Sequence, residues 1–236
     1  MHLTIVTGHS RGLGAALATQ LQAAGHAVLG LSRRPLPGLA ITQWAVDLAE
    51  PLPVAERLQA WLQDPARPAW HSVTLINNAA LLTEPGPLAA ADPAALSAAL
   101  RVGLEAPALL SRAFLAGTTG VTQRRILNIS SGLGRRALAG LAPYCAVKAG
   151  LDHLSRALAL EMPDVGVVSI APGVIDSDMQ QQLRGAQPAQ FAEQGRFQGL
   201  KDGGQLQTAE ATAEAQLRYL ARPDFGQQVI ADIREA

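Results

Sequence analysis

The sequence predicts an α/β protein whose single domain is built on a doubly wound parallel sheet of about seven strands flanked by helices. Short β-rich runs alternate with segments of helical periodicity along the chain, and this alternation is typical of a parallel sheet with right-handed crossovers. At 236 residues with 48% hydrophobic content, the chain can bury one substantial core. We therefore expect one domain over residues 1–236.

The first strand, expected at residues 3–7, runs into the turn TGHSRGLG and then into the helical segment ALATQLQAAG. Gly8, Gly12 and Gly14 let a ligand approach the backbone closely, and the first amides of a helix attract phosphate. A dinucleotide pyrophosphate fits this arrangement. The alternative is a glycine-rich turn that serves only tight packing.

The second strand, at residues 26–31, ends in Ser-Arg-Arg, where a site for NAD would carry an acidic residue for the ribose 2′-hydroxyl. Arg33 and Arg34 bring positive charge instead. Guanidinium groups bind phosphate through two parallel hydrogen bonds. We therefore expect the 2′-phosphate of NADP here, with Ser10 and Arg11 on its other side. The alternative is a solvated pair of arginines.

The third and fourth strands are expected at residues 42–46 and 72–76. Asp47 follows the third strand, where its carboxylate either accepts from an adenine amino group or caps the next turn. The fourth strand runs into Asn-Asn-Ala-Ala, and small residues after an apolar strand let a cofactor lie against the backbone. The proline-flanked residues 54–63 and the amphipathic residues 93–115 are expected to be helical.

The next strand, in the run ILNISSG, leads to Ser131, thirteen residues before Tyr144. Tyr144 and Lys148 lie four residues apart in a segment expected to be helical to about residue 162, so both side chains share one face. An ammonium group close to a phenol favours the phenolate, and we expect the Tyr144 pKa to be lowered from about 10. Tyr144 would then exchange protons near neutral pH. The alternative is a solvated helix face that carries Tyr and Lys without chemistry.

A sixth strand at residues 165–171 ends in the run PGVIDSDM. The residues that follow are rich in Gln and Gly, and we expect a mobile substrate lid over residues 176–208. A helix at about 208–221 and a seventh strand that ends at Asp232 are expected after the lid.

Composition and charge exclude several classes of partner. Nineteen basic and nineteen acidic residues cancel, so we expect no nucleic-acid or anionic-membrane binding and a small-molecule partner instead. The single cysteine, Cys145, excludes an internal disulfide, and no His and Cys cluster has metal-ligand spacing, so no metal is expected. We find no leader and no run of about 18 apolar residues, so we expect a protein of the reducing cytoplasm and not of a membrane.

Seven segments, in this order and spacing, resemble the short-chain dehydrogenase/reductase superfamily: TGHSRGLG, SRR, Asp47, NNAA, NISS, YCAVK and PGVIDSDM. The resemblance covers nearly the whole chain and implies a Rossmann fold that binds NADP(H). Within the superfamily, the runs PGVIDSDMQQQL and DFGQQVIADIRE resemble sepiapterin reductase and its bacterial relatives, which include benzil reductases.

The resemblance implies a role for each matched residue. Tyr144 matches the general acid of carbonyl reduction, and Lys148 matches the residue that lowers its pKa and holds the nicotinamide ribose. Ser131 matches the donor that orients the substrate carbonyl, with Ser130 as the neighbouring alternative. Asp232 matches the substrate-anchoring carboxylate of sepiapterin reductase, the alternative being that it ends the last strand and caps the chain locally. The cofactor-binding positions are Gly8, Ser10, Arg11, Gly12, Leu13, Gly14, Arg33, Arg34, Asp47, Asn77, Asn78, Ala79, Tyr144, Lys148, Pro172, Gly173, Ile175 and Ser177.

One position departs from the family pattern. The family usually carries an Asn twenty-eight residues before the catalytic serine, where this chain has Gly103. The family's proton relay uses the main-chain carbonyl at a helix kink there, and glycine keeps that carbonyl and tolerates a kink. The missing amide favours a slower enzyme or a non-catalytic protein.

We therefore expect an NADPH-dependent reductase that converts a small ketone or dicarbonyl to the alcohol by hydride transfer, with Tyr144 as general acid. One alternative is a non-catalytic NADPH-binding sensor or assembly subunit with the same fold. Another is a reductase of carrier-bound acyl chains, for which Arg135 and Arg136 would supply a basic docking surface. The family also implies a homodimer or homotetramer paired through the helices at 93–115 and 143–162.

Overall fold

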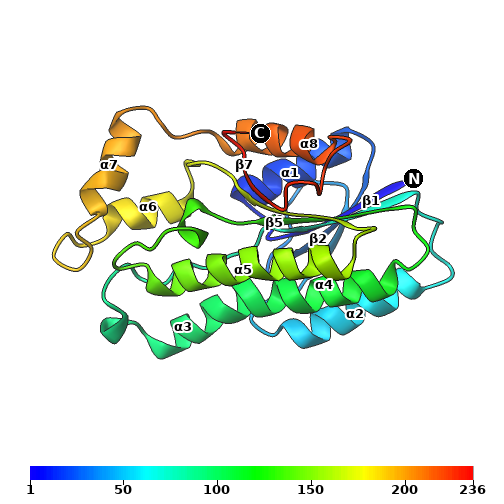
Figure 1. Cartoon of the computed structure of the whole chain (residues 1–236), viewed down its shortest axis with the longest axis horizontal. Helices are drawn as coiled ribbons and strands as arrows, with labels where there is room; N and C mark the ends of the chain where they lie inside the picture. The colour runs from blue at the N-terminus through cyan, green and yellow to red at the C-terminus, as the bar shows by residue number, and fades with distance from the viewer. Residues whose placement is uncertain (236) are drawn as a thin grey trace.

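The computed structural model describes residues 1–235 and has a seven-stranded parallel sheet with helices on both faces (Figure 1), which confirms the predicted fold class. The strand order is β3-β2-β1-β4-β5-β6-β7, so it reverses between β1 and β4. Open α/β sheets bind ligands at the carboxyl ends of the strands beside such a reversal. The strands are β1 (His2–Thr7), β2 (Ala27–Ser32), β3 (Thr42–Ala45), β4 (Ser72–Asn77), β5 (Gln123–Ile129), β6 (Gly166–Ala171) and β7 (Ile230–Asp232).

The helices form two layers around the sheet. In Figure 1, α1 and α8 lie above it, whereas α2, α4 and α5 lie below it. The helices are α1 (Gly12–Ala23), α2 (Pro51–Gln63), α3 (Pro93–Leu100), α4 (Ala106–Gly117), α5 (Ala142–Glu161), α6 (Asp178–Gly185), α7 (Gln194–Asp202) and α8 (Ala209–Leu220). Two 3-10 segments, η1 (Leu88–Ala90) and η3 (Gly132–Gly134), and a π turn, η2 (Arg101–Glu105), complete the described elements.

Two apolar clusters fill the space between the sheet and its helix layers. One buries Leu58 of α2 and Phe114 of α4, and the other buries Leu17 of α1 and Leu220 of α8. Burying each such side chain stabilises the fold by roughly 1.5 to 3 kcal/mol. The central strands are apolar on both faces because both faces are covered.

Local signals explain where several helices begin. Asp92 caps α3 by accepting from the amides of Ala94 and Ala95, and Thr208 caps α8 by accepting from the Ala211 amide at 3.1 Å. Helix α2 begins at Pro51, three residues earlier than predicted, because proline is tolerated in the first turn of a helix.

The continuous helix Pro93–Gly117, made of α3, η2 and α4, is by length and composition apolar enough to cross a membrane. The helix carries Arg101, Glu105 and Arg112, so it is not an uninterrupted run of about 18 apolar residues. In the fold, Leu110 and Phe114 on this helix are fully buried, and α4 packs against α2. The helix thus contributes apolar side chains to the core of the domain.

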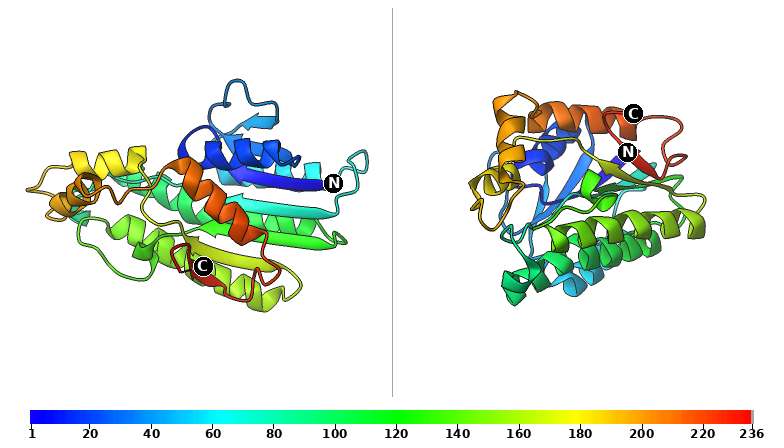
Figure 2. Two further views of the ribbon diagram at one scale, coloured as in Figure 1. Left: turned by 90° about the horizontal axis from the view of Figure 1, so that it is seen from above. Right: turned by 60° about the vertical axis from the view of Figure 1, so that its left-hand side comes forward.

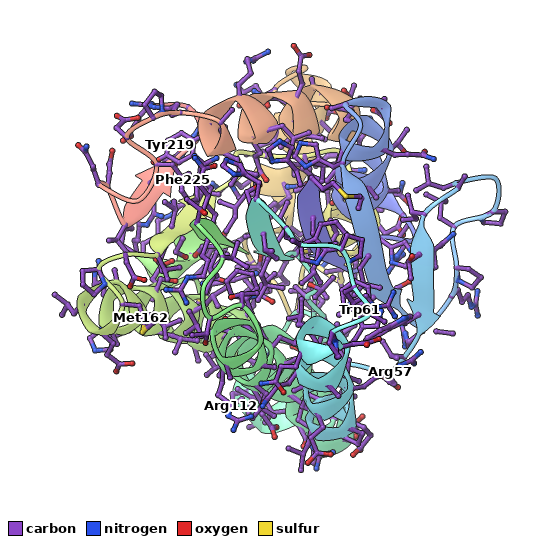
Figure 3. All side chains as sticks on the ribbon, turned by 90° about the vertical axis from the view of Figure 1, so that its right-hand side faces the viewer. Arg57, Trp61, Arg112, Met162, Tyr219 and Phe225 are labelled. Carbon is purple, nitrogen blue, oxygen red and sulfur yellow. The ribbon has the colours of Figure 1, made fainter. Side chains whose placement is uncertain are left out.

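Helices α6 and α7 project beyond the end of the sheet that lies away from the N-terminus (Figures 1 and 2). At the other end, Tyr219 and Phe225 pack edge to face with their ring centroids 6.0 Å apart (Figure 3). Phe225 lies against Gly166, where a Cβ would come within 2.9 Å of the ring. This contact holds the segment between α8 and β7 on β6, and so positions the last strand.

Candidate active site

Ser131, Tyr144 and Lys148 lie together at the carboxyl end of β5. Ser131 follows this strand by two residues and caps η3, accepting from the Leu133 amide at 3.2 Å. Tyr144 stands in the first turn of α5 and Lys148 one turn later. The Lys148 ammonium donates to the Ile129 carbonyl at 2.7 Å and lies 5.6 Å from the centroid of the Tyr144 ring. The predicted spacing therefore brings these three side chains into one site.

Burial shifts the pKa of both titratable groups in this site. Part of Tyr144 stays accessible, yet the protein packed around its phenol raises the pKa to about 12, against the hydrogen bond with Ser131 that lowers it. Burial also lowers the pKa of Lys148 to about 8, against the charge of Asp152 that raises it. The prediction that the Tyr144 pKa is lowered was therefore wrong, because loss of water outweighs the hydrogen bond with Ser131. Tyr144 keeps its proton throughout the neutral range.

The glycine turn has the conformation and close packing that its sequence predicts. Gly8 and Gly12 have φ of +69° and +52°, a region that side chains with a Cβ rarely adopt. A Cβ on Gly14 would lie 2.2 Å from the Gly8 carbonyl oxygen, whereas one on Gly12 would meet no protein atom within 4 Å. Arg11, the N-cap residue of α1, makes no side-chain hydrogen bond to the first amides of the helix. The turn is thus closed toward the protein and open on the side where a pyrophosphate would lie.

The two arginines after β2 are exposed and free. Within residues 1–235, neither the Arg33 nor the Arg34 guanidinium has a hydrogen bond or an ion pair with a protein group. Arg11, predicted on the other side of the phosphate, instead pairs with Asp178 at the start of α6. This pair connects the glycine turn to the first helix of the predicted lid.

A buried histidine beneath the glycine turn was missed by sequence reasoning. His9 is fully buried, and its Nε2 lies 2.7 Å from Oε1 of Gln43. The ring occupies the space above Gly30, where a Cβ would lie 2.5 Å from it. A glycine in the middle of the apolar strand β2 was the available signal, because such a glycine marks a close approach.

The predicted cofactor positions on β3 and β4 differ in what their side chains contact. Asp47 is exposed and accepts from the Ala49 amide at 2.9 Å, so it caps its turn, and the adenine contact stays a prediction. Asn78 donates to the Thr7 carbonyl at 2.9 Å and locks the glycine turn. Asn77 is buried and donates to Asn128 inside the sheet at 2.8 Å, which leaves only its backbone for a cofactor.

The segment after β6 continues the same rim. Gly173 has φ of +80°, Ile175 pairs with Gln207 in an isolated bridge, and Ser177 caps α6 by accepting from the Gln180 amide at 3.3 Å. Pro172 lies between β6 and this turn. The four predicted cofactor positions here are therefore held in an ordered turn beside the carboxyl ends of β6 and β7.

The predicted lid contains α6 and α7, which pack over the tyrosine. A third apolar cluster joins Leu183 and Phe191 of this segment to Leu133 and Leu141, with Tyr144 packed against it. Further partly buried members are Leu82, Leu138, Cys145, Met179 and Phe197. The surface beside the Tyr144 phenol is therefore largely apolar and partly aromatic.

Gly103 lies in the π turn η2, which packs beside α5. A Cβ at Gly103 would lie 2.4 Å from Cγ1 of Val147, so the valine fills the space where an Asn side chain would begin. The predicted tolerance of irregular helix geometry is confirmed, since π turns are such irregularities.

Asp232 ends β7 and is held by its neighbour. Arg234 donates to both carboxylate oxygens, at 2.8 Å from Nε and 2.5 Å from Nη2, and its amide donates at 3.0 Å. These bonds lower the pKa of Asp232. The arrangement agrees with the alternative that Asp232 caps the chain locally, while substrate anchoring stays a prediction.

The glycine turn, the uncapped helix and the Ser-Tyr-Lys cluster form one rim along the carboxyl ends of the strands, as expected of a dinucleotide-dependent oxidoreductase. Residues 2–188 match the family model for short chain dehydrogenase. The chain belongs to the short-chain dehydrogenase/reductase family of oxidoreductases.

Among curated relatives, the chain is 32% identical over 232 residues to a benzil reductase ((S)-benzoin forming) of Bacillus subtilis, covering 94% of each chain. It is also 32% identical to the sepiapterin reductase of Meriones unguiculatus, covering 94% of this chain and 92% of that one.

Solved structures with the same fold include complexes with both nicotinamide cofactors. A metagenomic short-chain oxidoreductase in complex with NADP is 27% identical, has a TM-score of 0.72 and matches 98% of this chain and 94% of its own. A 3-oxoacyl-[acyl-carrier protein] reductase from Brucella melitensis in complex with NAD is 23% identical, with a TM-score of 0.79 and coverage of 98% and 94%.

Proposed function

We propose that the protein is an NADPH-dependent reductase of small, largely apolar ketones or dicarbonyls. The observation that carries the proposal is the meeting of Ser131, Tyr144 and Lys148 at the end of β5, under an apolar cluster that includes Phe191 and Leu183. The relatives named for benzil and sepiapterin reduction support a carbonyl substrate.

The cofactor assignment rests on the open side of the glycine turn and on Arg33 and Arg34. Gly12 faces open space, and α1 offers its uncapped amides to the pyrophosphate. The two free guanidinium groups would bind a 2′-phosphate, and Lys148 would bind the nicotinamide ribose. A bound reduced nicotinamide supplies the hydride.

In this mechanism the protein orients the carbonyl and delivers the proton. Ser131 and Tyr144 donate hydrogen bonds to the carbonyl oxygen, and Tyr144 gives up its proton as the oxygen gains negative charge. Its pKa of about 12 keeps the phenol protonated, and the Lys148 ammonium beside the ring stabilises the phenolate that remains. The apolar cluster excludes water from the developing charge.

A panel of carbonyl compounds tests the proposal by the loss of NADPH absorbance. Benzil and smaller aromatic diketones are expected to be reduced faster than sepiapterin. The cluster beside Tyr144 is apolar, and both oxygens of the Asp232 carboxylate already accept hydrogen bonds from Arg234. Tight NADPH binding without turnover on any member of the panel would favour the non-catalytic sensor or assembly subunit, the alternative that Gly103 supports.

For assembly, we propose a homodimer or homotetramer formed through α4 and α5. Leu160 at the end of α5 is 85% exposed and Leu100 at the end of α3 is 40% exposed, and an interface that covered these side chains would remove apolar surface from water. Light scattering on the purified protein is expected to give at least twice the 24.6 kDa of one chain.

A further inference from the structure

The carboxylate of Asp152 is buried beneath the active site and has no part in the chemistry described so far. The residue is 2% exposed and stands on α5, one helical turn after Lys148. The Ser169 hydroxyl on β6 donates to one of its oxygens at 2.6 Å. The Arg135 guanidinium, two residues after Leu133 in the loop, donates to the other at 3.3 Å. Both carboxylate oxygens therefore have a hydrogen-bond donor.

Lys148 lies on the same face of the helix, and its buried ammonium would be stabilised by a nearby negative charge. It is 3% exposed, and its ammonium donates to the neutral carbonyl of Ile129. Lys148 forms no salt bridge within residues 1–235. Residues four apart on a helix are neighbours, with Cβ atoms about 5 to 6 Å apart. Asp152 is therefore the buried carboxylate that lies next to the lysine.

We propose that Asp152 is a positioning residue for the catalytic lysine, and that its buried charge, held by Ser169 and Arg135, keeps the Lys148 ammonium protonated and in place. The burial that lowers the Lys148 pKa is opposed by the charge of Asp152, in agreement with this role. Its effect on reduction rests on the function proposed above, whereas its effect on the lysine does not.

The surroundings of Asp152 restrict where its charge acts. Arg135 also donates to the Ala231 carbonyl of β7 at 2.7 Å, and beyond it Asp232 and Arg234 neutralise each other. A Cβ at Gly134 would lie 3.0 Å from the Asp152 carboxylate, so the loop backbone lies directly over it. The charged groups facing Asp152 are thus Lys148 on its own helix and Arg135 from the loop.

The test measures the titration of Lys148 directly. The chain has two lysines, Lys148 and Lys201, so protein grown with lysine labelled with ¹³C at Cε gives two side-chain signals. A Lys201→Arg variant assigns them. The Cε shift is followed from pH 6 to 11 in the full-length protein, with no cofactor or substrate in the sample, so the result does not depend on turnover.

Asp152→Asn is expected to lower the Lys148 pKa by about one unit or more, since an opposite charge at this range shifts a pKa by roughly 1 to 3 units. Ser169→Ala is the matched control, because it removes a hydrogen bond from the same carboxylate and leaves its charge. The control is expected to change the Lys148 pKa by less than about 0.3 unit. An unchanged pKa in Asp152→Asn, or an equal fall in Ser169→Ala, would overturn the proposal.

Arg135→Gln provides a second test with the opposite sign, and it decides the question if Asp152→Asn does not fold. Removing the guanidinium leaves the Asp152 charge without its counter-charge, so the Lys148 pKa is expected to rise. A fall or no change would contradict the proposal. The pH dependence of kcat is then measured on the same variants. A lysine titration that moves while the alkaline limb of kcat does not would support the proposal for Asp152 and contradict the proposed mechanism.

Discussion

The two halves of the candidate site differ in their contact with water. The half that contains Tyr144 and Lys148 is enclosed, and burial there moves one pKa up to about 12 and the other down to about 8. The half that contains Arg33 and Arg34 is exposed, and those side chains bind no protein group within residues 1–235. Charges act strongly where water is excluded and weakly where it screens them. In the function proposed above, the enclosed half would control reactivity, and the exposed half would select the ligand with smaller energies.

The largest expected effect tests the enclosed half. Tyr144→Phe removes one oxygen that is needed only as charge develops on the substrate. The rate of carbonyl reduction is expected to fall on the order of 10² to 10⁴-fold, while the fold and the affinity for NADPH stay as they are. Stopped-flow or steady-state NADPH absorbance measures the rate, and NADPH fluorescence measures the affinity.

Cys145→Ser is the control for this substitution, because it changes the neighbouring side chain without removing a proton donor. It is expected to keep most of the rate. A Tyr144→Phe variant that retained most of the wild-type rate would show that another group is the general acid. The enclosed half of the site would then not control the rate.

A second test measures how the burial of Lys148 and Tyr144 makes the free energy of unfolding depend on pH. The pKa of Lys148 is about 8 in the folded protein and 10.5 ordinarily, so between these values the unfolded chain binds more protons. The free energy of unfolding should therefore rise as the pH rises from about 8. Above pH 10 the opposite holds for Tyr144, whose pKa is raised from 10.0 to about 12, so stability falls again as the pH approaches 12.

Urea unfolding at pH 7.5, 8.5 and 9.5 measures this slope, which cannot exceed about 1.4 kcal/mol per pH unit for one group. Lys148→Met is expected to abolish the rise, because it removes the buried ammonium. The matched variant Lys201→Met should keep it, since Lys201 is exposed and pairs with Asp176 at 2.5 Å. The same slope in wild type and Lys148→Met would show that the lysine is not desolvated.

The exposed half predicts a smaller effect on ligand choice. The protein is expected to bind NADPH at least ten times more tightly than NADH, which requires only about 1.4 kcal/mol from contacts with the 2′-phosphate. Arg33→Asp should move the preference toward NADH, and the control Arg218→Asp on the outer face of α8 should leave it unchanged. Equal dissociation constants for the two cofactors in wild type would refute the assignment.

The smallest expected effect concerns Asp232 at the end of β7, and it tests whether this carboxylate belongs to the enclosed half of the site. If Asp232 anchors substrate, Asp232→Asn raises KM for substrates with N–H donors and leaves a donor-free diketone unaffected, through a charge-assisted bond worth about 1.5 to 3 kcal/mol. Arg234 already donates to both carboxylate oxygens, which favours the other outcome. In that outcome the melting temperature falls, and the rates of reduction of both substrates fall equally. Arg234→Gln separates these outcomes, since it frees the carboxylate without removing it.

The elements that could be predicted from sequence are those with local causes. The strands, the glycine turn and the Tyr144 and Lys148 spacing follow from periodicity and backbone freedom within a few residues. The direction of the Tyr144 pKa could not be predicted, because it depends on Leu133, Phe191 and other side chains that arrive from distant parts of the chain.

Other features escaped prediction because each needs two distant segments. The contact of Arg135 with Asp152 joins a loop to a helix seventeen residues away, and His9 meets Gln43 from the next but one strand. The pair of Arg11 and Asp178 joins residues that are 167 positions apart in the sequence. Sequence patterns record the period of an element but not which side chains meet when elements pack.

The close fit of Gly103 and Val147 constrains how this protein can change over generations. Adding an Asn at position 103 while Val147 is present places its Cβ 2.4 Å from Cγ1 of the valine, and shrinking Val147 first leaves a cavity that lowers stability. The two positions therefore depend on each other, because either substitution alone lowers stability and the two made together compensate for one another. A lineage that acquires an amide at position 103 is therefore expected to need stability to spare before the change.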